Sequence, residues 1–433
     1  MTIAHHPQRQ TIWHELHARP YVRFSGPAHV LRLSYLVGEG GEDFDRESLL
    51  RLTEALGIAA TYETPMHVIY ATTIPRFGRL VLSWERHSEL VAYTFYLYAL
   101  EIPFRPFGFD FMELIPGGWL NSLPTSPLVA SRVAVGSRSD MPDTPEGLIE
   151  IFEGHTVNGS RVMAGRAEAW SCYRAHRDGF GRIAVIVDQM SPQEQGRTVE
   201  RLLAIEDYYH LVLFSLPLAR EVKPGLASAE RRMVLEMDAL RGAESLEKKR
   251  AVLDALLALA AAVEHLRARV SNRFAASSAY FSLLESRFGE LREAKIEHVL
   301  PLNRFVMRRV RPAAETYRSL LERLANLSER INRASDLLRT GIELCVEEQN
   351  QRLLESADRR ARLQLRLQEA VESLSVVVVT YYVLALVGYA FKGLKSRGFD
   401  FDLDATIGLA VPIVLLAVIG AVYLVHRHFR DRP

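Results

Sequence analysis

Cysteine is almost absent from this chain of 433 residues, which contains only Cys172 and Cys345. Two isolated thiols cannot build a cysteine-rich metal site, and a structural disulfide is not expected in a cytosolic protein. The N-terminus, MTIAHHPQRQTIWHELHARP, also lacks the apolar core of a secretory signal. We therefore expect the polar part of the chain to remain in the cytosol.

The sequence signatures of common enzymes are missing as well. Gly38–Gly41 lacks the Lys and Ser/Thr of a phosphate-binding loop, and neither a Gly-x-Ser-x-Gly elbow nor a kinase motif set occurs. The net charge is +1, so no strong field favours nucleic acid. The arginine run Arg304–Arg311 is more typical of a solvated helix face. We expect no nucleic-acid partner, and an enzymatic activity is less expected than a binding or structural role.

Charge is absent from two apolar segments near the C-terminus, residues 374–391 and 407–425. At about 1.5 Å per helical residue, each crosses most or all of a hydrocarbon core of roughly 30 Å. A buried helix pair in a soluble protein is the alternative, but core helices rarely run so far without a charge. The pattern therefore predicts a transmembrane hairpin over residues 374–425, with the lipid bilayer as a partner.

The basic residues that flank these segments predict the orientation of the hairpin. Four arginines in 359–366 precede the first span and three in 427–432 follow the second, whereas the connecting loop holds Lys392, Lys395 and Arg397. Basic residues are retained on the cytoplasmic side. We expect a bacterial inner-membrane protein with both termini in the cytoplasm and a short periplasmic loop.

The N-terminal zone, residues 1–220, is rich in aromatic residues, Pro and Gly and predicts a cytosolic α+β domain. Arg79–Tyr98 has the Val, Tyr and Phe content of two strands around a turn near His87–Glu89. The first of these strands alternates apolar residues with partners that include Ser83 and Glu85. This alternation is typical of a half-buried strand with one face in solvent.

Further elements are expected in the same zone. A second pair of strands is predicted at residues 161–173 and 183–187, with an Asp-Gly-Phe-Gly turn between them. Helices are predicted at residues 45–56 and 194–215. The polar segment 136–147 would join two lobes if this domain is divided.

Residues 226–372 contain little Pro or Gly and much Leu, Ala, Glu and Arg, which predicts a stalk of long, coiled-coil-like helices. We expect breaks at Pro224-Gly225, Pro301 and Pro312. The last helix should run through residues 359–372 into the first span. A three-four spacing of apolar residues supports helix packing at Leu324, Leu327, Ile331, Ala334 and Leu338.

Polar groups within the two apolar segments are few. The hydroxyls of Thr380 and Tyr381 would bond a neighbouring helix or line a pore, and Gly388 would permit close helix contact. The spans contain no ionisable residue, so a proton relay inside the membrane is not expected. The acidic loop would gather cations outside the membrane or, more commonly for such sequences, form a solvated turn; it contains Asp400, Asp402 and Asp404.

Candidate ligand or metal residues cluster at two places in the N-terminal zone. His14 and His17 are three residues apart, which places both on one helix face. Glu85 and His87 stand at a strand end. A divalent cation is the candidate cofactor for these four residues, although the histidine spacing differs from that of zinc hydrolases. The more common explanation is a structural ion-pair network, which would also include Arg19 and Arg86.

Five long segments resemble a bacterial family called domain of unknown function 3422. They are HELHARP (14–20), WERHSELVAYTF (84–95), PGGWL (116–120), GRAEAWSCYRAHRDGFGRIAVIVDQMSP (165–192) and SLPLARE (215–221). The resemblance extends over nearly the whole chain and implies membership without implying an activity.

The layout is also similar to that of CorA-type divalent-cation transporters, which form rings around a pore-lining first span. Those proteins carry Gly-Met-Asn at the outer end of that span, whereas this chain has Val387–Phe391 without Met-Asn. We therefore expect a membrane-anchored homo-oligomer acting as a scaffold, sensor or envelope-associated structural protein. A CorA-like cation channel is the second hypothesis, and a metal-dependent enzyme in the N-terminal domain is the third.

Overall fold

The chain divides into two compact units in the computed structural model. One unit comprises Met1–Gly242 and Asp254–Ala334, and the other comprises Ala243–Leu253 and Ser335–Pro433. The structure describes residues 6, 8–9, 12–13, 20–37, 41–123, 125–142, 144–396 and 402–430.

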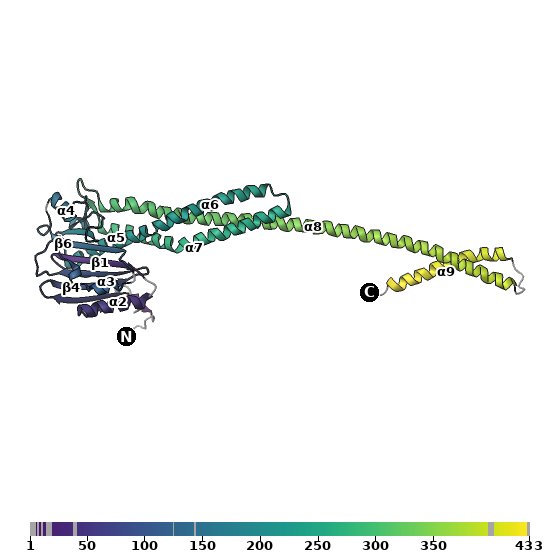
Figure 1. Ribbon diagram of the computed structural model, residues 1–433, viewed down its shortest axis with the longest axis horizontal. Coiled ribbons are helices and arrows are strands. Elements are labelled where there is room, and N and C mark those ends of the chain that lie inside the picture. Colours follow the sequence, from purple (N-terminus) through teal and green to yellow (C-terminus); the bar gives the residue numbers. More distant parts are fainter. Residues whose placement is uncertain are drawn as a thin grey trace. The chain divides into compact units, whose positions relative to one another are not determined.

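The described strands form one ten-stranded sheet in the first unit (Figure 1). Neighbouring strands are antiparallel except for the parallel pair β6 and β9. The order across the sheet is β10-β7-β8-β9-β6-β1-β5-β4-β3-β2. The strands are β1 (Ala28–Leu36), β2 (Ala60–Glu63), β3 (His67–Ile74), β4 (Gly78–Arg86), β5 (Leu90–Tyr98), β6 (Val129–Ser137), β7 (Asn158–Val162), β8 (Ala167–Ser171), β9 (Gly181–Val187) and β10 (Ala294–Lys295).

Short helices connect the strands, and long helices follow them. The short ones are α2 (Gly41–Leu56), η1 (Phe111–Glu113), α3 (Gly117–Asn121), α4 (Pro145–Ile151) and η2 (Met163–Gly165). The long ones are α5 (Pro192–Phe214), α6 (Leu216–Arg241), α7 (Leu246–Leu291), α8 (Leu302–Ser396) and α9 (Leu403–Arg430). The expectation of a domain of mixed helices and sheet followed by long helices is confirmed, as are helices over 45–56 and 194–215.

The two predicted strand pairs are also present. The turn between β4 and β5 lies at residues 87–89, where the His87 N–H donates to the Leu90 carbonyl over 2.7 Å. β8 and β9 pair in antiparallel fashion, as expected from the Asp-Gly turn between them. The predicted segment 161–173 also contains the end of a separate strand, β7, which pairs with β8.

The sheet is buried on both faces near its centre. One face packs its apolar residues, including Leu82, Trp84 and Tyr93, against α2, η1 and α3. The other face of β4 contains Val81 and Ser83, which are each 4% exposed. The expectation of a half-buried β4 with a solvated polar face is therefore wrong, because long helices cover the polar side as well.

A second apolar cluster lies on the part of the sheet formed by β6, β8 and β9. Ala134, Trp170 and Ile186 pack there with Leu148 and Phe152 of the α4 region. The described residues of the polar segment 136–147 link β6 to α4, so this segment connects elements of one continuous sheet domain. A division into two lobes stays a prediction.

The long helices differ from the expectation at two prolines. Pro301 directly precedes α8, as expected, but Pro224 lies inside α6 and Pro312 lies inside α8. Both internal prolines are on exposed helix positions, where water can bond the carbonyl that loses its partner. Buried neighbours such as Leu226 and Val310 hold the helices in place.

The predicted apolar seam of α8 is buried, from Leu324 to Leu338. Within the first unit, Phe274 of α7 stacks on Tyr317 of α8 at 4.9 Å, and the Tyr317 hydroxyl donates to the Val212 carbonyl over 2.8 Å. α8 then continues without interruption through residues 359–372 to Ser396. The expectation of one helix that runs into the first apolar segment is confirmed.

Candidate functional site

A polar stripe crosses the sheet on the face that α5 covers. Strand register places Ser131, Arg32, Thr94 and Ser83 side by side across four strands. The next row on the same face contains Ser34, Glu85 and His67. Because side chains two residues apart share a sheet face, these residues converge beneath the covering helix. Nearly all of them are buried.

Helix α5 places acidic residues directly over this stripe. Ser191 caps the N-terminus of the helix in a capping box: its hydroxyl accepts from the Glu194 N–H, and the Glu194 carboxylate accepts from the Ser191 N–H. Glu200, Ala204, Asp207 and Leu211 then follow at helical spacing and line one cavity with the sheet. The sequence thus builds a charged layer between a helix and a sheet.

Arg32 is the buried cation at the centre of this layer. Its Nη2 lies 2.6 Å from Asp207 Oδ2, and its Nη1 donates to Thr94 Oγ1 over 3.2 Å. The Ser34 hydroxyl donates to the other Asp207 oxygen over 2.7 Å. Burial lowers the pKa of Arg32, but Asp207 and Glu85 outweigh burial and raise that pKa above its ordinary value. Arg32 and Asp207 therefore form a satisfied, permanently charged pair.

Glu85 is the second acid of the layer and is less tightly held. Its carboxylate lies 3.8 Å from Arg32, 3.5 Å from His87 Nε2 and 3.8 Å from His67 Nε2. Burial raises the pKa of Glu85, but His87, Arg32 and His67 together pull the pKa well below its usual range. Glu85 is consequently ionised at neutral pH.

Glu200 is the third acid, and it forms no ion pair or hydrogen bond among the described residues. Burial, together with the negative charge of Glu85, raises the pKa of Glu200 to about 7. A carboxyl group with this pKa is partly protonated and partly ionised at physiological pH. Glu200 is therefore the titrating member of the cluster.

These side chains line a cavity of about 590 Å³ between β1, β4, α5 and α7. Its far wall contains Tyr208 and Tyr280, whose rings stack with centroids 6.0 Å apart. Arg287 also lines the cavity, but its guanidinium is bound to Glu290 at 2.7 and 2.9 Å. Cavities of this size hold small ligands.

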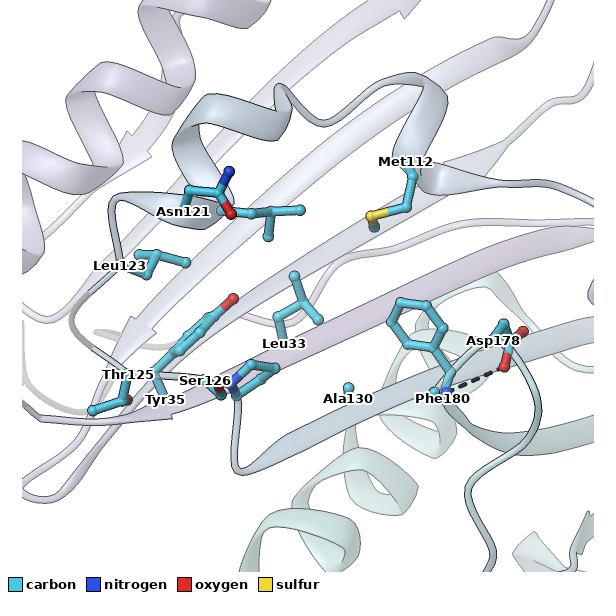
Figure 2. Close-up of a pocket in the computed structure, with 13 residues that line it drawn as sticks. Leu33, Tyr35, Met112, Asn121, Leu123, Thr125, Ser126, Ala130, Asp178 and Phe180 are labelled. Atoms are coloured by element: carbon cyan, nitrogen blue, oxygen red, sulfur yellow. Dashed lines mark hydrogen bonds between the residues drawn. The ribbon is translucent and has the colours of Figure 1, made fainter.

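A second cavity, of about 570 Å³, lies on the opposite face of the sheet (Figure 2). Figure 2 shows Leu33 of β1 near the middle of the cavity, with Met112 and Phe180 toward one end and Tyr35 and Leu123 toward the other. The acid at its edge, Asp178, is already engaged by Arg132, Arg182 and the Phe180 N–H. Asp178 is the charged group that lines this cavity among the described residues, and it is already paired, so we take the charged cavity as the candidate site.

The structure brings together only part of the predicted site. Glu85 and His87 do line the charged cavity. His14, His17 and Arg19 lie outside the described residues. Among the described residues, no group of three or more His, Cys, Asp and Glu side chains is placed to hold a metal ion.

Arg86, which the sequence analysis places in the same structural network, pairs instead with Asp45 at 2.9 Å. Sequence reasoning missed Arg32, Glu200 and Asp207. The pattern HVLRLSYL, in which polar residues alternate with apolar ones, was the available indication for Arg32. In the sequence, Glu200 and Asp207 are indistinguishable from solvent-exposed helix residues. The structure shows that they face the sheet across the cavity.

The candidate residues of the apolar segments belong to the second unit. Thr380 is buried, and its hydroxyl donates to the Val376 carbonyl of its own helix over 2.7 Å. Tyr381 is 71% exposed. A methyl group added at Gly388 would lie 3.7 Å from Ile407 Cδ1, so α8 and α9 are close there.

The acidic loop is described only in part. The Asp402 carboxylate accepts from the backbone N–H of Asp404 over 3.1 Å and so caps the start of α9. Asp400 lies outside the described residues.

Comparison with known proteins gives a family but no activity. A family model described as "Protein of unknown function (DUF3422)" matches residues 4–429. No curated protein matches the sequence.

Proposed function

Since the chain belongs to the DUF3422 family, whose description assigns no activity, we propose a function from the structure: a membrane-anchored homo-oligomer whose sheet domain is a sensor. A bilayer holds the apolar end of α8 and α9, and the charged cavity of the sheet domain takes the ligand. The scaffold role expected from the sequence is included in this proposal, because an anchored oligomer also organises whatever it binds.

The observation that carries the proposal is the exposed apolar surface of the C-terminal helices. In the part of the chain that the structure describes, three helical segments are long and apolar enough to span a membrane. In the segments within α8 and α9, only 6% of the apolar window is buried by the chain itself. Side chains such as Leu386 and Leu416, 68% and 70% exposed, would be unstable in water, and a lipid phase accommodates them.

The third segment, Pro192–Arg241, does not fit a membrane. Half of its apolar window is buried in the sheet domain. It also contains Glu206 and Asp207, whose side chains bond Ser131 and Arg32 of the sheet. We assign it to the protein core, which leaves two spans that connect through a short loop as a hairpin.

Arginines support a cytoplasmic location for both ends of this hairpin. The polar helix before the first span holds Arg359, Arg360, Arg362 and Arg366, in agreement with the rule that basic residues stay inside. The sheet domain would then be cytoplasmic, at the inner membrane of a bacterium.

The part of α8 before the first span supports the oligomer. Over residues 342–374 most charged residues lie on one helix face and most apolar residues on the other, although Arg360 lies on the apolar face and Leu365 on the charged one. Leu353, Leu363 and Leu367 are 68%, 64% and 61% exposed. The regular three-four seam of α8 fails in the polar stretch that contains Glu348 and Arg352, and beyond it Leu353, Leu363 and Leu367 recur at heptad-compatible spacing with polar residues such as Ser356 and Arg360 between them. A second copy, held parallel in the same bilayer, would cover this seam.

Ion conduction is not included in the proposal. The Thr380 hydroxyl is occupied by a carbonyl of its own helix, and the pore signature of CorA-type proteins is absent from Val387–Phe391. A metal-dependent enzyme is likewise not adopted, because within the described part of the chain no group of three or more His, Cys, Asp and Glu side chains could hold a metal ion.

Fractionation with two arginine substitutions tests the anchor. In Val378→Arg/Leu416→Arg, each charge costs about 2.5–3.5 kcal/mol at the centre of a span. We expect this variant to leave the alkali-washed membrane fraction, while Glu355→Arg on the charged face of α8 remains there. An unchanged distribution of the double variant would contradict the anchor.

Light scattering in mild detergent tests the oligomer. Leu353→Glu/Leu367→Glu should reduce the protein mass to that of a monomer, because it places charges in the seam. Glu355→Gln/Arg366→Gln is the matched control on the opposite face and should keep the oligomeric mass. A wild-type protein that is monomeric in gentle detergents would remove the oligomer from the proposal.

A further inference from the structure

Three carboxyl groups and two guanidinium groups line the charged cavity. Arg32 is paired with Asp207 at 2.6 Å, and Arg287 is bound to Glu290. Each guanidinium group therefore has its shortest ion pair with an acid other than Glu85 or Glu200. Glu85 reaches Arg32 only at 3.8 Å, and Glu200 adds a further carboxylate to the cavity wall.

Both remaining acids keep capacity for a ligand. The imidazoles and the guanidinium that stabilise the Glu85 carboxylate lie at 3.5–3.8 Å, longer than a short charge-assisted hydrogen bond. Glu200 has no hydrogen bond or ion pair within the described part of the chain. A ligand that donates hydrogen bonds and carries positive charge would supply what both carboxylates lack.

The rest of the lining fits the body of an organic cation. The stacked rings of Tyr208 and Tyr280 form an aromatic wall, and cations are attracted to the faces of such rings. Ala204, Leu211 and Leu283 supply apolar surface for an alkyl chain. A bare metal ion would not use this wall, and an anion would find both guanidinium groups already paired.

We propose that the cavity between β1, β4, α5 and α7 binds a small organic cation through an ammonium or guanidinium group held by Glu85 and Glu200. The alkyl part of the ligand lies against Tyr280 and Leu283. This inference rests on the proposed sensor function in that it gives the sensor its ligand class. Amines and guanidines share the required chemistry, and the experiment separates them.

Isothermal titration calorimetry on the full-length protein in detergent micelles at pH 8 tests the proposal, with agmatine and putrescine as probes. We expect saturable binding of at least one probe with a Kd of about 1–100 μM. Preference for agmatine identifies a guanidinium ligand, and preference for putrescine identifies an amine. No binding of either probe at millimolar concentration, or equal binding of inorganic phosphate, would overturn the proposal.

Two variants and a control locate the site. Glu200→Gln should weaken binding at least tenfold while it keeps the fold, since it removes the charge of a half-buried carboxylate without changing its shape. Tyr280→Leu should weaken it about threefold to tenfold, as expected when an exposed or partly desolvated cation–π contact is lost. Glu47→Gln, an exposed acid of α2 on the other face of the sheet, should bind as wild type does. Full affinity in Glu200→Gln would overturn the proposal.

The outcome is independent of membrane association. A protein that leaves the membrane fraction but binds agmatine would contradict the anchor alone. A membrane-bound protein that binds neither probe would contradict this inference alone.

Discussion

Replacement of Glu200 by Gln should make the protein more stable, by a margin that grows as the pH rises from about 4.5 to 7 and is largest at neutral and alkaline pH. The ordinary pKa of a glutamate is 4.5, and in the folded protein burial and Glu85 raise the pKa of Glu200 to about 7. A raised carboxyl pKa means that the folded state binds its proton more tightly than the unfolded state does. The contribution of Glu200 to the free energy of unfolding is then highest below pH 4.5 and falls as the pH rises from there through 7.

The size of this effect follows from the pKa difference. A change of roughly 2.5 pH units at about 1.4 kcal/mol per unit gives about 3 kcal/mol of lost stability above pH 7. Glutamine keeps the shape and has no charge to bury, so the variant avoids this loss. For a domain of this size, 3 kcal/mol corresponds to roughly 6–12 °C in Tm.

Thermal unfolding followed by tryptophan fluorescence measures the difference. Trp84 and Trp119 are buried in the sheet domain and report on its unfolding. The full-length wild type and Glu200→Gln would be compared in detergent from pH 5 to pH 8, with Glu47→Gln as the exposed control. We expect the Tm of Glu200→Gln to exceed that of wild type by a margin that grows with pH. A margin that does not depend on pH, or a variant less stable than wild type at pH 8, would refute the reasoning.

Three further substitutions test other parts of the same layer. Asp207→Asn should lower the free energy of unfolding by about 3–5 kcal/mol in chemical denaturation, because it leaves the buried Arg32 without its partner; a loss below 1 kcal/mol would show that Glu85 replaces it. Glu85→Gln should destabilise the protein at pH 7 but little near pH 2, because the lowered pKa of Glu85 contributes stability above pH 4.5 that is lost as the pH falls; pH-dependent Tm values check this, and an equal loss at both pH values would disprove it. Gly196→Ala should cost about 1–3 kcal/mol, because a Cβ there would overlap the carbonyl oxygen of Val22; wild-type thermal stability would contradict the close packing of residue 22 on α5.

Sequence patterns predicted the regular elements where one physical rule acted alone. The Val, Tyr and Phe content of Arg79–Tyr98 was sufficient for β4 and β5, and the uncharged run after Leu374 was sufficient for the apolar end of α8. The predicted helix breaks at Pro224 and Pro312 were wrong. The burial of neighbouring residues stabilises each helix by more than one lost hydrogen bond on its solvent-facing side destabilises it.

The candidate site was harder to predict because it depends on pairing across large distances in sequence. Glu85 and His87 were found as a local cluster, but their partners Arg32 and Asp207 are contributed by a different strand and by α5. β4 was predicted to be half-buried because the alternation of apolar and polar residues shows which side chains share a face of the strand. The alternation does not show which other elements cover that face. Strand register and the position of α5 supply this missing information.

The ends of the sheet have a consequence for a protein that we propose is concentrated on a membrane surface. One edge strand, β10, has only two residues, Ala294 and Lys295, and the other, β2, has four residues with an irregular register at Ala60/Tyr62. Short, charged or irregular edges offer little template for another chain to add a strand. Copies crowded on a membrane could add strands to one another if the sheet had long open edges. The short strands at both edges would oppose such fibre growth, and the proposed association of copies would then depend on the helices.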